Sequence, residues 1–278
     1  MKVKLLFLAL VFTAAAASAQ SAGPRVQDIV SSTAFREAKA FLDGDHERFV
    51  RELTVLTEIP APPFKEQKRA AAYLEMLRAA KLADVEMDAE GNVMGVRRGA
   101  GTGPMLAVLA HLDTVHPIGM IEKDLKVRRE GDSIFGPGIY DMKAGGYIAY
   151  YAMRHLQRLG KKTKLPVTFL FIPEEEVGSP TSRARIEEAA RGHKYALVME
   201  PGRDGDRVVT SRKGVGRFTL TVKGAASHAG VRHEDGRSAI HEMARQIMRI
   251  EAKTDYADRK STRLNSSHVS ESRMPSSA

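Results

Sequence analysis

Apolar residues recur along the chain at two spacings, and each spacing predicts one kind of element. A spacing of three or four residues predicts amphipathic helices, whereas short apolar or alternating runs predict strands. Helices are predicted over residues 28–59, around 70–82, and over 142–159, 182–191 and 236–250. The predicted strands are a hairpin over 85–98, buried strands at 105–110, 167–172 and 195–199, and alternating segments at 125–135 and 207–222.

The order of these elements predicts an α/β fold. Buried strands alternate with helices through the central part of the chain, which is the pattern of βαβ units. Such units build a doubly wound, mostly parallel sheet with helices on its faces. After residue 210 the pattern changes to alternating segments and one helix, so we expect a second, smaller α+β domain to begin at residue 211.

A histidine and several acids follow the buried strands directly. His111 comes after the first strand and Glu200 after the third. Glu175 and Glu176 follow the second, and Asp141 lies in a glycine-rich turn between the first two. Because ligand sites of open α/β sheets lie at the carboxyl ends of the strands, we expect these side chains to lie close together.

This residue set suits a pair of divalent cations. Imidazole nitrogen and carboxylate oxygen bind Zn²⁺ in sites that keep a position open for water, whereas acids collected without a cation would repel one another. The candidate ligands are His111, Asp141, Glu176 and Glu200, with Asp141 as the bridge between two ions. Glu175 is then left to act as the general base on a bound water. Nitrogen and oxygen ligands suit Zn²⁺, Co²⁺ and Mn²⁺ alike, and the chain has no cysteine.

Each motif alone also has an ordinary structural interpretation. A histidine two residues before an aspartate commonly forms a hydrogen-bonded pair, and a run of glutamates is typical of a helix start. The Gly136-Pro137-Gly138 sequence by itself indicates only a tight turn. His116 lies just past the strand, and either a ligand role or a place at the rim of the pocket is open to it. The combination of all four motifs behind buried strands favours the metal site.

Four motifs, in this order and at these spacings, resemble the zinc exopeptidase family of carboxypeptidase G, acetylornithine deacetylase, succinyl-diaminopimelate desuccinylase, aminoacylase and peptidase T. They are His-Leu-Asp-Thr-Val from His111, Gly-Pro-Gly-Ile-Tyr-Asp-Met-Lys from Gly136, Glu-Glu-Glu from Glu174, and Met-Glu-Pro-Gly from Met199. The first two are most similar to the carboxypeptidase G branch. The resemblance covers residues 45–257.

The resemblance implies a role for each of these residues. His111 and Glu200 would hold one ion, Glu176 the other, and Asp141 would bridge both, with a cis peptide bond after it. Asp113 would orient His111. Glu175 would be the catalytic base, and Glu174 would have no part, in a place where the family often has aspartate.

The second domain is also interpreted through the resemblance. It would be the family's lid, which carries the contact of a homodimer. The histidine of its Ser-His-Ala-Gly motif, here His228, would stabilise the oxyanion of the reaction across that dimer. The alternative is a histidine that only caps a turn. Ser238 stands where the family often has asparagine, so no polar role is carried over to that position.

The two ends of the chain have a different character from its body. Residues 1–19 contain Lys2 and Lys4, an apolar run and an Ala-Ser-Ala site, which is typical of a secretory signal peptide; an uncleaved anchor is the alternative. We therefore expect an exported, periplasmic or secreted protein, with a catalytic domain over 20–210 and a partial lid over 211–258. The serine-rich stretch 259–278 has no periodicity, and we expect it to be non-native or disordered.

A C-terminally truncated chain would lack one ligand. Members of the resembled family return from the lid to the catalytic domain and supply a further histidine to the ion that Glu176 holds. His268 in the tail is a poor substitute. We therefore expect one ion to bind more tightly than the second, and this chain alone to have little activity.

Charge argues against a nucleic-acid partner. The formal net charge is +9, but two positive charges belong to residues 1–19 and a net three to the tail from Arg259, which leaves the body at +4. No basic stripe interleaved with aromatic residues is present. The expected activity is hydrolysis of an amide bond that releases a C-terminal amino acid from a small peptide or N-acyl amino acid, without nucleic acid or membrane. The alternatives are a deacylase or aminopeptidase of the same chemistry, and a non-catalytic exported binding protein.

Overall fold

The structure, a computed structural model, describes residues 26–101, 105–123, 125–203, 205, 207–210 and 218–253. The chain divides into two compact units, Met1–Pro201 and Gly202–Ala278. The predicted signal peptide at 1–19 and the tail at 259–278 lie outside the described residues. The predicted domain boundary at 210/211 stays a prediction, because residues 211–217 are not described either.

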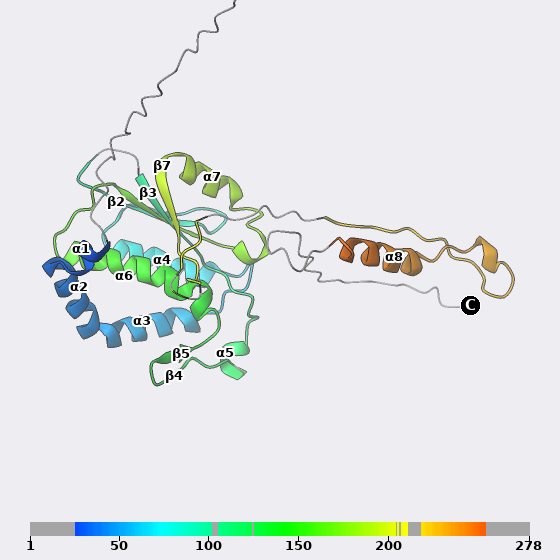
Figure 1. Ribbon diagram of the computed structural model, residues 1–278, viewed down its shortest axis with the longest axis horizontal. Coiled ribbons are helices and arrows are strands. Elements are labelled where there is room, and N and C mark those ends of the chain that lie inside the picture. Colours follow the sequence, from blue (N-terminus) through cyan, green and yellow to red (C-terminus); the bar gives the residue numbers. More distant parts are fainter. Residues whose placement is uncertain are drawn as a thin grey trace, which may run out of the picture. The chain divides into compact units, whose positions relative to one another are not determined.

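A five-stranded mixed sheet forms the centre of the first unit (Figure 1). Its strand order is β1 (Ala83–Met87), β2 (Val93–Arg97), β6 (Val167–Ile172), β3 (Met105–His111) and β7 (His193–Val198). β6, β3 and β7 are parallel, while β1 and β2 form the predicted antiparallel hairpin at one edge. In the parallel part His111 is paired with Ile172, and Leu109 with Val198. The carboxyl ends of the three strands therefore meet at one rim.

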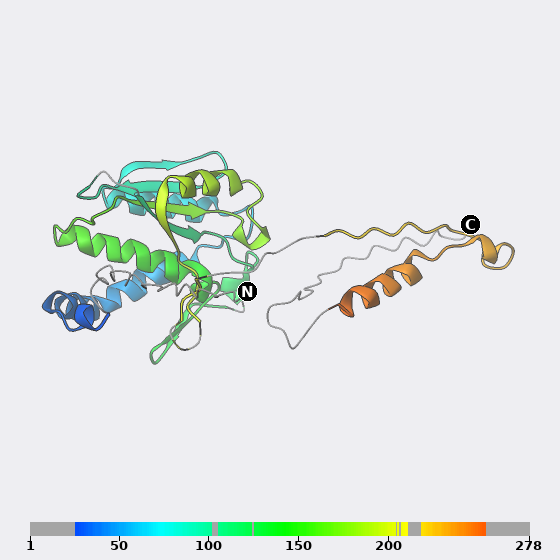
Figure 2. The same ribbon diagram turned by 45° about the horizontal axis from the view of Figure 1, so that its top comes forward.

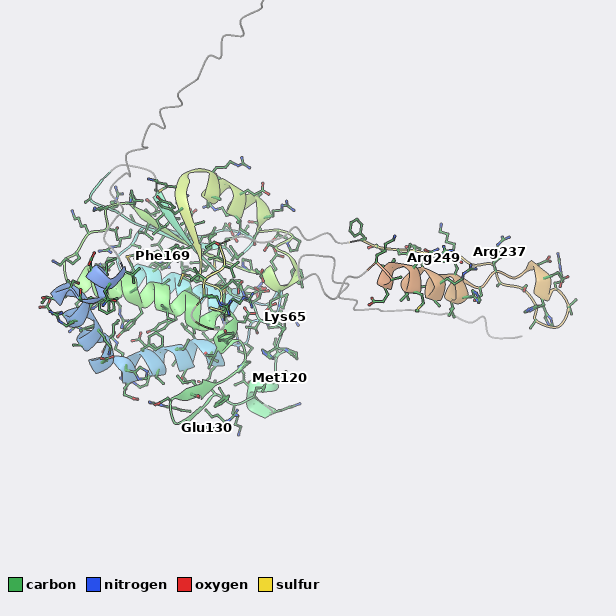
Figure 3. The ribbon with its side chains drawn as sticks, viewed as in Figure 1. Lys65, Met120, Glu130, Phe169, Arg237 and Arg249 are labelled. Carbon is green, nitrogen blue, oxygen red and sulfur yellow. The ribbon has the colours of Figure 1, made fainter. Side chains whose placement is uncertain are left out.

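Helices cover both faces of this sheet. α4 (Gln67–Ala79) and α6 (Ala144–Arg158) pack on one face, where the rings of Tyr73 and Phe171 stack with centroids 4.1 Å apart. Figure 2 shows α6 running along the sheet. α7 (Arg183–Arg191) lies on the other face. Phe169, labelled in Figure 3, is 1% exposed within β6. The predicted α/β fold is therefore confirmed.

The N-terminal helical region is broken into three helices, so the continuous helix predicted over 28–59 is wrong. The helices are α1 (Val26–Val30), α2 (Thr33–Gly44) and α3 (His46–Glu58). Ser32 begins α2 by accepting a hydrogen bond from Phe35 N at 3.1 Å. Asp45 ends it, since its amide donates to the carbonyls of Phe41 and Leu42. The turn at Asp45 lets α3 pack against α6, where Phe49 meets Tyr147 and Tyr151.

Shorter elements surround the rim of the sheet. They are α5 (Met120–Lys123), β4 (Arg128–Glu130), β5 (Ser133–Phe135), a kinked turn η1 (Ile139–Lys143) and a 3-10 turn η2 (Glu175–Val177). β4 and β5 form a separate antiparallel pair, in the region predicted to alternate. The peptide bond between Asp141 and Met142 is cis, which confirms what the resemblance implied.

The second unit contains one long helix among its described residues. α8 (Ala239–Glu251) begins at Ser238, whose hydroxyl accepts from His241 N at 3.1 Å, and a 3-10 turn η3 (His233–Asp235) precedes it. The prediction of strands over 207–222 is wrong for the described part of that range. Residues 207–210 and 218–222 are not in a strand, and among them Arg207 forms an isolated bridge with Arg203. Among the described residues, no helix is long and apolar enough to cross a membrane.

Candidate metal centre

The imidazole of His111 is the centre of a ring of acids. Its Nε2 lies 3.1 Å from an oxygen of Asp141, 3.9 Å from one of Glu200 and 4.0 Å from one of Glu175. Glu176 offers an oxygen to the same cluster: one set of ligand atoms within 4.8 Å of one another is His111, Asp141 and Glu176, and a second is His111, Glu175 and Glu200. The structure thus brings together all the ligand candidates and the predicted base.

Asp113 fixes which nitrogen of His111 faces the acids. Nδ1 lies 3.0 Å from the Asp113 carbonyl oxygen and 3.3 Å from its carboxylate. Both groups are acceptors, so Nδ1 carries the proton and Nε2 is the nitrogen presented to the acids. The ring is held at the end of β3, and the side chains of His111 and Asp113 are 1% and 0% exposed.

Electrostatics at the centre favour a positive charge. Burial lowers the pKa of His111, but the hydrogen bond and charge of Asp113, the charge of Glu175 and the contact with Asp141 outweigh it and raise that pKa to about 9. Burial raises the pKa of Glu176, and the neighbouring acids raise it further, while His111 lowers it. A proton on His111 therefore compensates the acids when no cation does. The donor set of one imidazole nitrogen and several carboxylate oxygens is one that Zn²⁺, Co²⁺ and Mn²⁺ accept, so the residues present fit such an ion.

The acidic loop, residues 173–179, is attached to the same aspartate. Glu175 N and Glu176 N each donate to one oxygen of the Asp113 carboxylate, both at 3.0 Å. The loop follows β6, as the His111 segment follows β3, and the parallel pairing of these two strands brings both segments to the rim. One buried carboxylate therefore positions the imidazole and the acidic loop relative to each other.

Two glycines permit the close backbone approaches at the rim. Gly138 has φ +66° and lies against the Thr114 side chain, so a Cβ there would overlap the Thr114 methyl group. Gly145, at the start of α6, lies against the Met199 carbonyl oxygen, which a Cβ would also overlap. Because Glu200 follows Met199, this approach places the last acid of the ring next to the η1 turn that carries Asp141.

A pocket of about 310 Å³ opens beside the acids. Asp141 and Glu176 line it, and His116 lies on its wall, which fits the rim position considered for His116. The remaining lining residues are Thr114, Val115, Gly136, Gly138, Ile139 and Tyr140. A substrate that occupies this pocket would lie in contact with the acids of the centre.

The pairing of ligands that the resemblance implied stays a prediction. The implied first set joins Glu200 to His111 and Asp141, but here Glu200 shares its set with His111 and Glu175. Glu175 therefore lies within reach of a ligand role as well as the predicted base role. His228 belongs to the second unit, where its exposed ring accepts a hydrogen bond from Gly230 N at 3.2 Å. Its catalytic role stays a prediction.

Four charged residues behind the centre were missed or misjudged. Glu66, Arg69, Lys143 and Glu174 are all at most 3% exposed. Glu174, expected to have no part in the chemistry, has contacts within the loop instead: its Oε1 accepts from the amides and hydroxyls of Thr181 and Ser182. The sequence carried a signal for Arg69, because this charged residue precedes Tyr73 and Leu77 by one and two helical turns on the apolar face of α4.

Two histidines away from the centre also differ from expectation. His155, expected on the surface, is 8% exposed and stacks on Phe41 with ring centroids 4.1 Å apart. His193, expected in a solvated loop, begins β7 and contacts the Thr168 hydroxyl through Nε2 at 2.8 Å. In both cases a neighbouring element covers the ring, which the local sequence does not reveal.

A mostly parallel sheet that collects one histidine and several carboxylates at the carboxyl ends of its strands is typical of metal-dependent hydrolases. Residues 107–269, more than half of the chain, match the model of the Peptidase family M20/M25/M40. The chain belongs to this family.

Curated relatives match part of their own length. Carboxypeptidase G2 of Pseudomonas sp. (strain RS-16) is 35% identical over 159 residues, which is 57% of this chain and 38% of that protein. The succinyl-diaminopimelate desuccinylase of Leptothrix cholodnii is 29% identical over 170 residues, 57% of this chain and 43% of its own length. The chain thus spans about two fifths of the length of these relatives.

Solved structures share the fold. A tripeptidase from Staphylococcus aureus superposes with a TM-score of 0.54 at 19% identity, covering 73% of this chain and 56% of that one. The aminopeptidase PepT from Bacillus cereus gives a TM-score of 0.50 at 22% identity with the same coverage. At this level of identity the likeness concerns the architecture of the chain alone.

Proposed function

We propose that the protein is a metal-dependent amide hydrolase that releases a C-terminal amino acid from a small peptide or an N-acyl amino acid. The observation that carries the proposal is the ring of acid oxygens within 4.0 Å of His111 Nε2 at the rim of a peptidase-family sheet. The carboxypeptidase character is supported by the 35% identity to carboxypeptidase G2.

Two zinc ions are the proposed cofactors. His111, Asp141, Glu176 and Glu200 would hold them, and Glu175 lies in one set with His111 and Glu200. When bound, such ions polarise the scissile carbonyl and lower the pKa of water. Co²⁺ and Mn²⁺ accept the same donors.

The protein's own groups would handle the proton. Glu175, with its side chain 44% exposed, is accessible to water and takes the proton of the attacking water before passing it to the leaving nitrogen. Asp113 keeps the proton of His111 on Nδ1 throughout, because both of its nearby oxygens are acceptors. The pocket beside Asp141 and Glu176 would hold the residue that is released.

His228 and the second unit complete the proposal. By motif, His228 donates to the oxyanion that develops on the substrate carbonyl, and a homodimer brings it to the active site of the partner. Replacing His228 with glutamine is then expected to lower turnover strongly while leaving zinc binding unchanged. A loss of zinc from this variant would contradict the assignment.

Export is proposed from the sequence of the N-terminus. The two lysines, the apolar run and the Ala-Ser-Ala site of residues 1–19 support a cleaved leader and a periplasmic or secreted location. Expression in a bacterium with mass analysis of the periplasmic fraction tests this. A mature protein that begins at Gln20 is expected, and one retaining Met1 in the cytoplasm would contradict it.

Amide hydrolysis is the test of the enzymatic proposal. The chain would be assayed with Zn²⁺ against N-acyl amino acids, dipeptides and N-succinyl amino acids, and release of the free amino acid measured with and without a chelator. Zinc-dependent release from N-acyl amino acids or from the carboxyl end of peptides supports the carboxypeptidase proposal. A preference for N-succinyl compounds over other N-acyl amino acids and over peptides supports the deacylase alternative. A preference for peptides with a free amino terminus supports the aminopeptidase alternative. Zinc binding without turnover, both in this chain and in a longer chain that supplies a further histidine, supports the non-catalytic alternative.

A further inference from the structure

Three successive amides of the acidic loop each donate to a buried carboxylate. Glu175 N and Glu176 N use the two oxygens of Asp113. Glu174 N, immediately before them, donates to Oε1 of Glu66 at 3.1 Å. Asp113 belongs to the centre itself, but Glu66 lies outside it, at the start of α4 and 108 residues away from Glu174 in the sequence.

Glu66 is built into this position by contacts on both sides. It is 3% exposed and precedes the first residue of α4, beside Lys65, which is labelled in Figure 3. Its Oε1 also accepts from Phe64 N at 2.8 Å, which closes the turn before the helix. The same oxygen thus joins the turn before α4 to the loop after β6.

The loop residue that Glu66 contacts has an unusual backbone. Glu174 has φ 55° and ψ 26°, in the left-handed region, where a residue with a Cβ is held only by its surroundings at a cost of about 1–3 kcal/mol. Its carbonyl accepts from Val177 N and Ser179 N, and its side chain binds Thr181 and Ser182. The amide of Glu174 is the one part of this arrangement that reaches α4.

Arg69, one turn further along α4, contacts the other segment of the centre. Its guanidinium donates to the carbonyl oxygen of Leu112, between His111 and Asp113, and to that of Ile59. The beginning of α4 therefore contacts both segments of the centre, the His111 segment through Arg69 and the acidic loop through Glu66.

We propose that Glu66 is a positioning residue of the metal centre, which sets the direction of Glu175 and Glu176 through its hydrogen bond to the Glu174 amide. The inference rests on the proposed function, because it assigns Glu66 a part in cation binding. It predicts that loss of this acceptor loosens the acidic loop and weakens cation binding while the sheet stays folded.

Amide hydrogen exchange tests the positioning without any metal. Metal-free wild type, Glu66→Ala, Glu66→Gln and the exposed control Glu75→Gln would be compared. Glu66→Ala is expected to speed exchange of the amides of residues 174–177 by at least about tenfold, with unchanged exchange in β3 and β6. Glu66→Gln keeps an oxygen for both donors and is expected to restore slow exchange, and Glu75→Gln to match wild type. Unchanged exchange of the loop in Glu66→Ala, or faster exchange throughout the sheet, would overturn the proposal.

Cobalt binding then tests the consequence for the centre. Titration with Co²⁺, followed by its visible absorption, is expected to give an affinity about tenfold lower for Glu66→Ala than for wild type. Glu66→Gln is expected to lie within about threefold of wild type. Equal affinities of wild type and Glu66→Ala would overturn the positioning role. Should wild type bind no Co²⁺, the proposed function fails, while the exchange experiment still decides the position of the loop.

Glu66→Asp provides the same test if Glu66→Ala does not fold. It keeps the charge but withdraws the carboxylate by one methylene group, so the Oε1 contacts of Glu66 to Phe64 N and Glu174 N cannot both be made. Faster exchange of the loop and weaker Co²⁺ binding are expected again. Wild-type behaviour of Glu66→Asp in both measurements would overturn the proposal.

Discussion

Glu175 could act either as a metal ligand or as the general base, and the two roles predict different effects of a substitution. Its oxygen lies 4.0 Å from His111 Nε2 and in one set with Glu200, which suits a ligand, yet its exposure suits a base that meets water. Glu175→Gln separates the two. As a base, its loss is expected to lower turnover about 10²–10⁴-fold with the zinc content unchanged. Loss of a bound ion from Glu175→Gln would contradict the base and assign a ligand.

His111 is expected to release a proton when a cation binds. Its pKa of about 9 in the metal-free protein means that the ring is charged at pH 7.5, whereas a ligand histidine is neutral. Calorimetric titration with Zn²⁺ in buffers of different ionisation enthalpy should therefore show release of about one proton per chain at pH 7.5. A binding enthalpy that does not depend on the buffer would contradict the raised pKa.

The raised pKa of His111 also determines how the stability of the metal-free protein changes with pH. In the folded protein the pKa of His111 is about 9, above the ordinary histidine value of 6.5. The stabilisation that this proton provides is therefore fully present below about pH 6.5 and is lost as the pH rises through 9. In the metal-free protein, unfolding by urea at several pH values would show the change.

At the scale of single residues, the sequence predicted the ring of acids because each acid closely follows a predicted strand or a glycine-rich turn. It did not predict Glu66, because a glutamate before a helix is ordinary in sequence and its partner, the Glu174 amide, lies 108 residues away. Lys143 was missed for the same reason: its ammonium donates to the carbonyls of Thr57 and Pro137, which come from other elements.

Helix α4 stabilises the rim of the sheet, because its buried residue Arg69 donates hydrogen bonds to the carbonyls of Leu112 and Ile59. Arg69→Met would leave the carbonyls of Leu112 and Ile59 without this donor. Since each buried acceptor left unpaired costs about 1–3 kcal/mol, the free energy of unfolding should fall by at least about 2 kcal/mol in urea titrations. The matched control is Arg78→Met, whose side chain is 54% exposed on the same helix. Equal stabilities of the two variants would contradict this role.

At the scale of elements, the parallel strands and the helices between them could be predicted from their apolar runs. The strand predicted to be buried at 195–199 is wrong in one respect: residues 194–198 of β7 are exposed, because β7 is an edge strand of the sheet. The break between α2 and α3 was missed although Gly44, the last residue of α2, is of a type that commonly ends helices, because the apolar spacing resumes in α3. The segment 207–222 alternates like a strand, but alternation alone does not supply the neighbour that a strand needs. Its described residues form no sheet.

For the molecule as a whole, the described core and the entire centre belong to the first unit. The core cluster extends from Leu53 to Phe171, and each acid of the ring precedes Pro201. Cation binding is therefore a property that the first unit can show by itself, whereas the proposed turnover also involves His228 of the second unit.

Zinc content tests the central claim most directly. The metal-free chain and its His111→Ala variant would be dialysed to equilibrium against Zn²⁺ at pH 7.5 and the bound metal measured per chain. At least one tightly bound Zn²⁺ per wild-type chain is expected, with a second, weaker ion at higher concentration, and loss of the tight ion in His111→Ala. No bound zinc in the wild type, or equal zinc in both chains, would contradict the account.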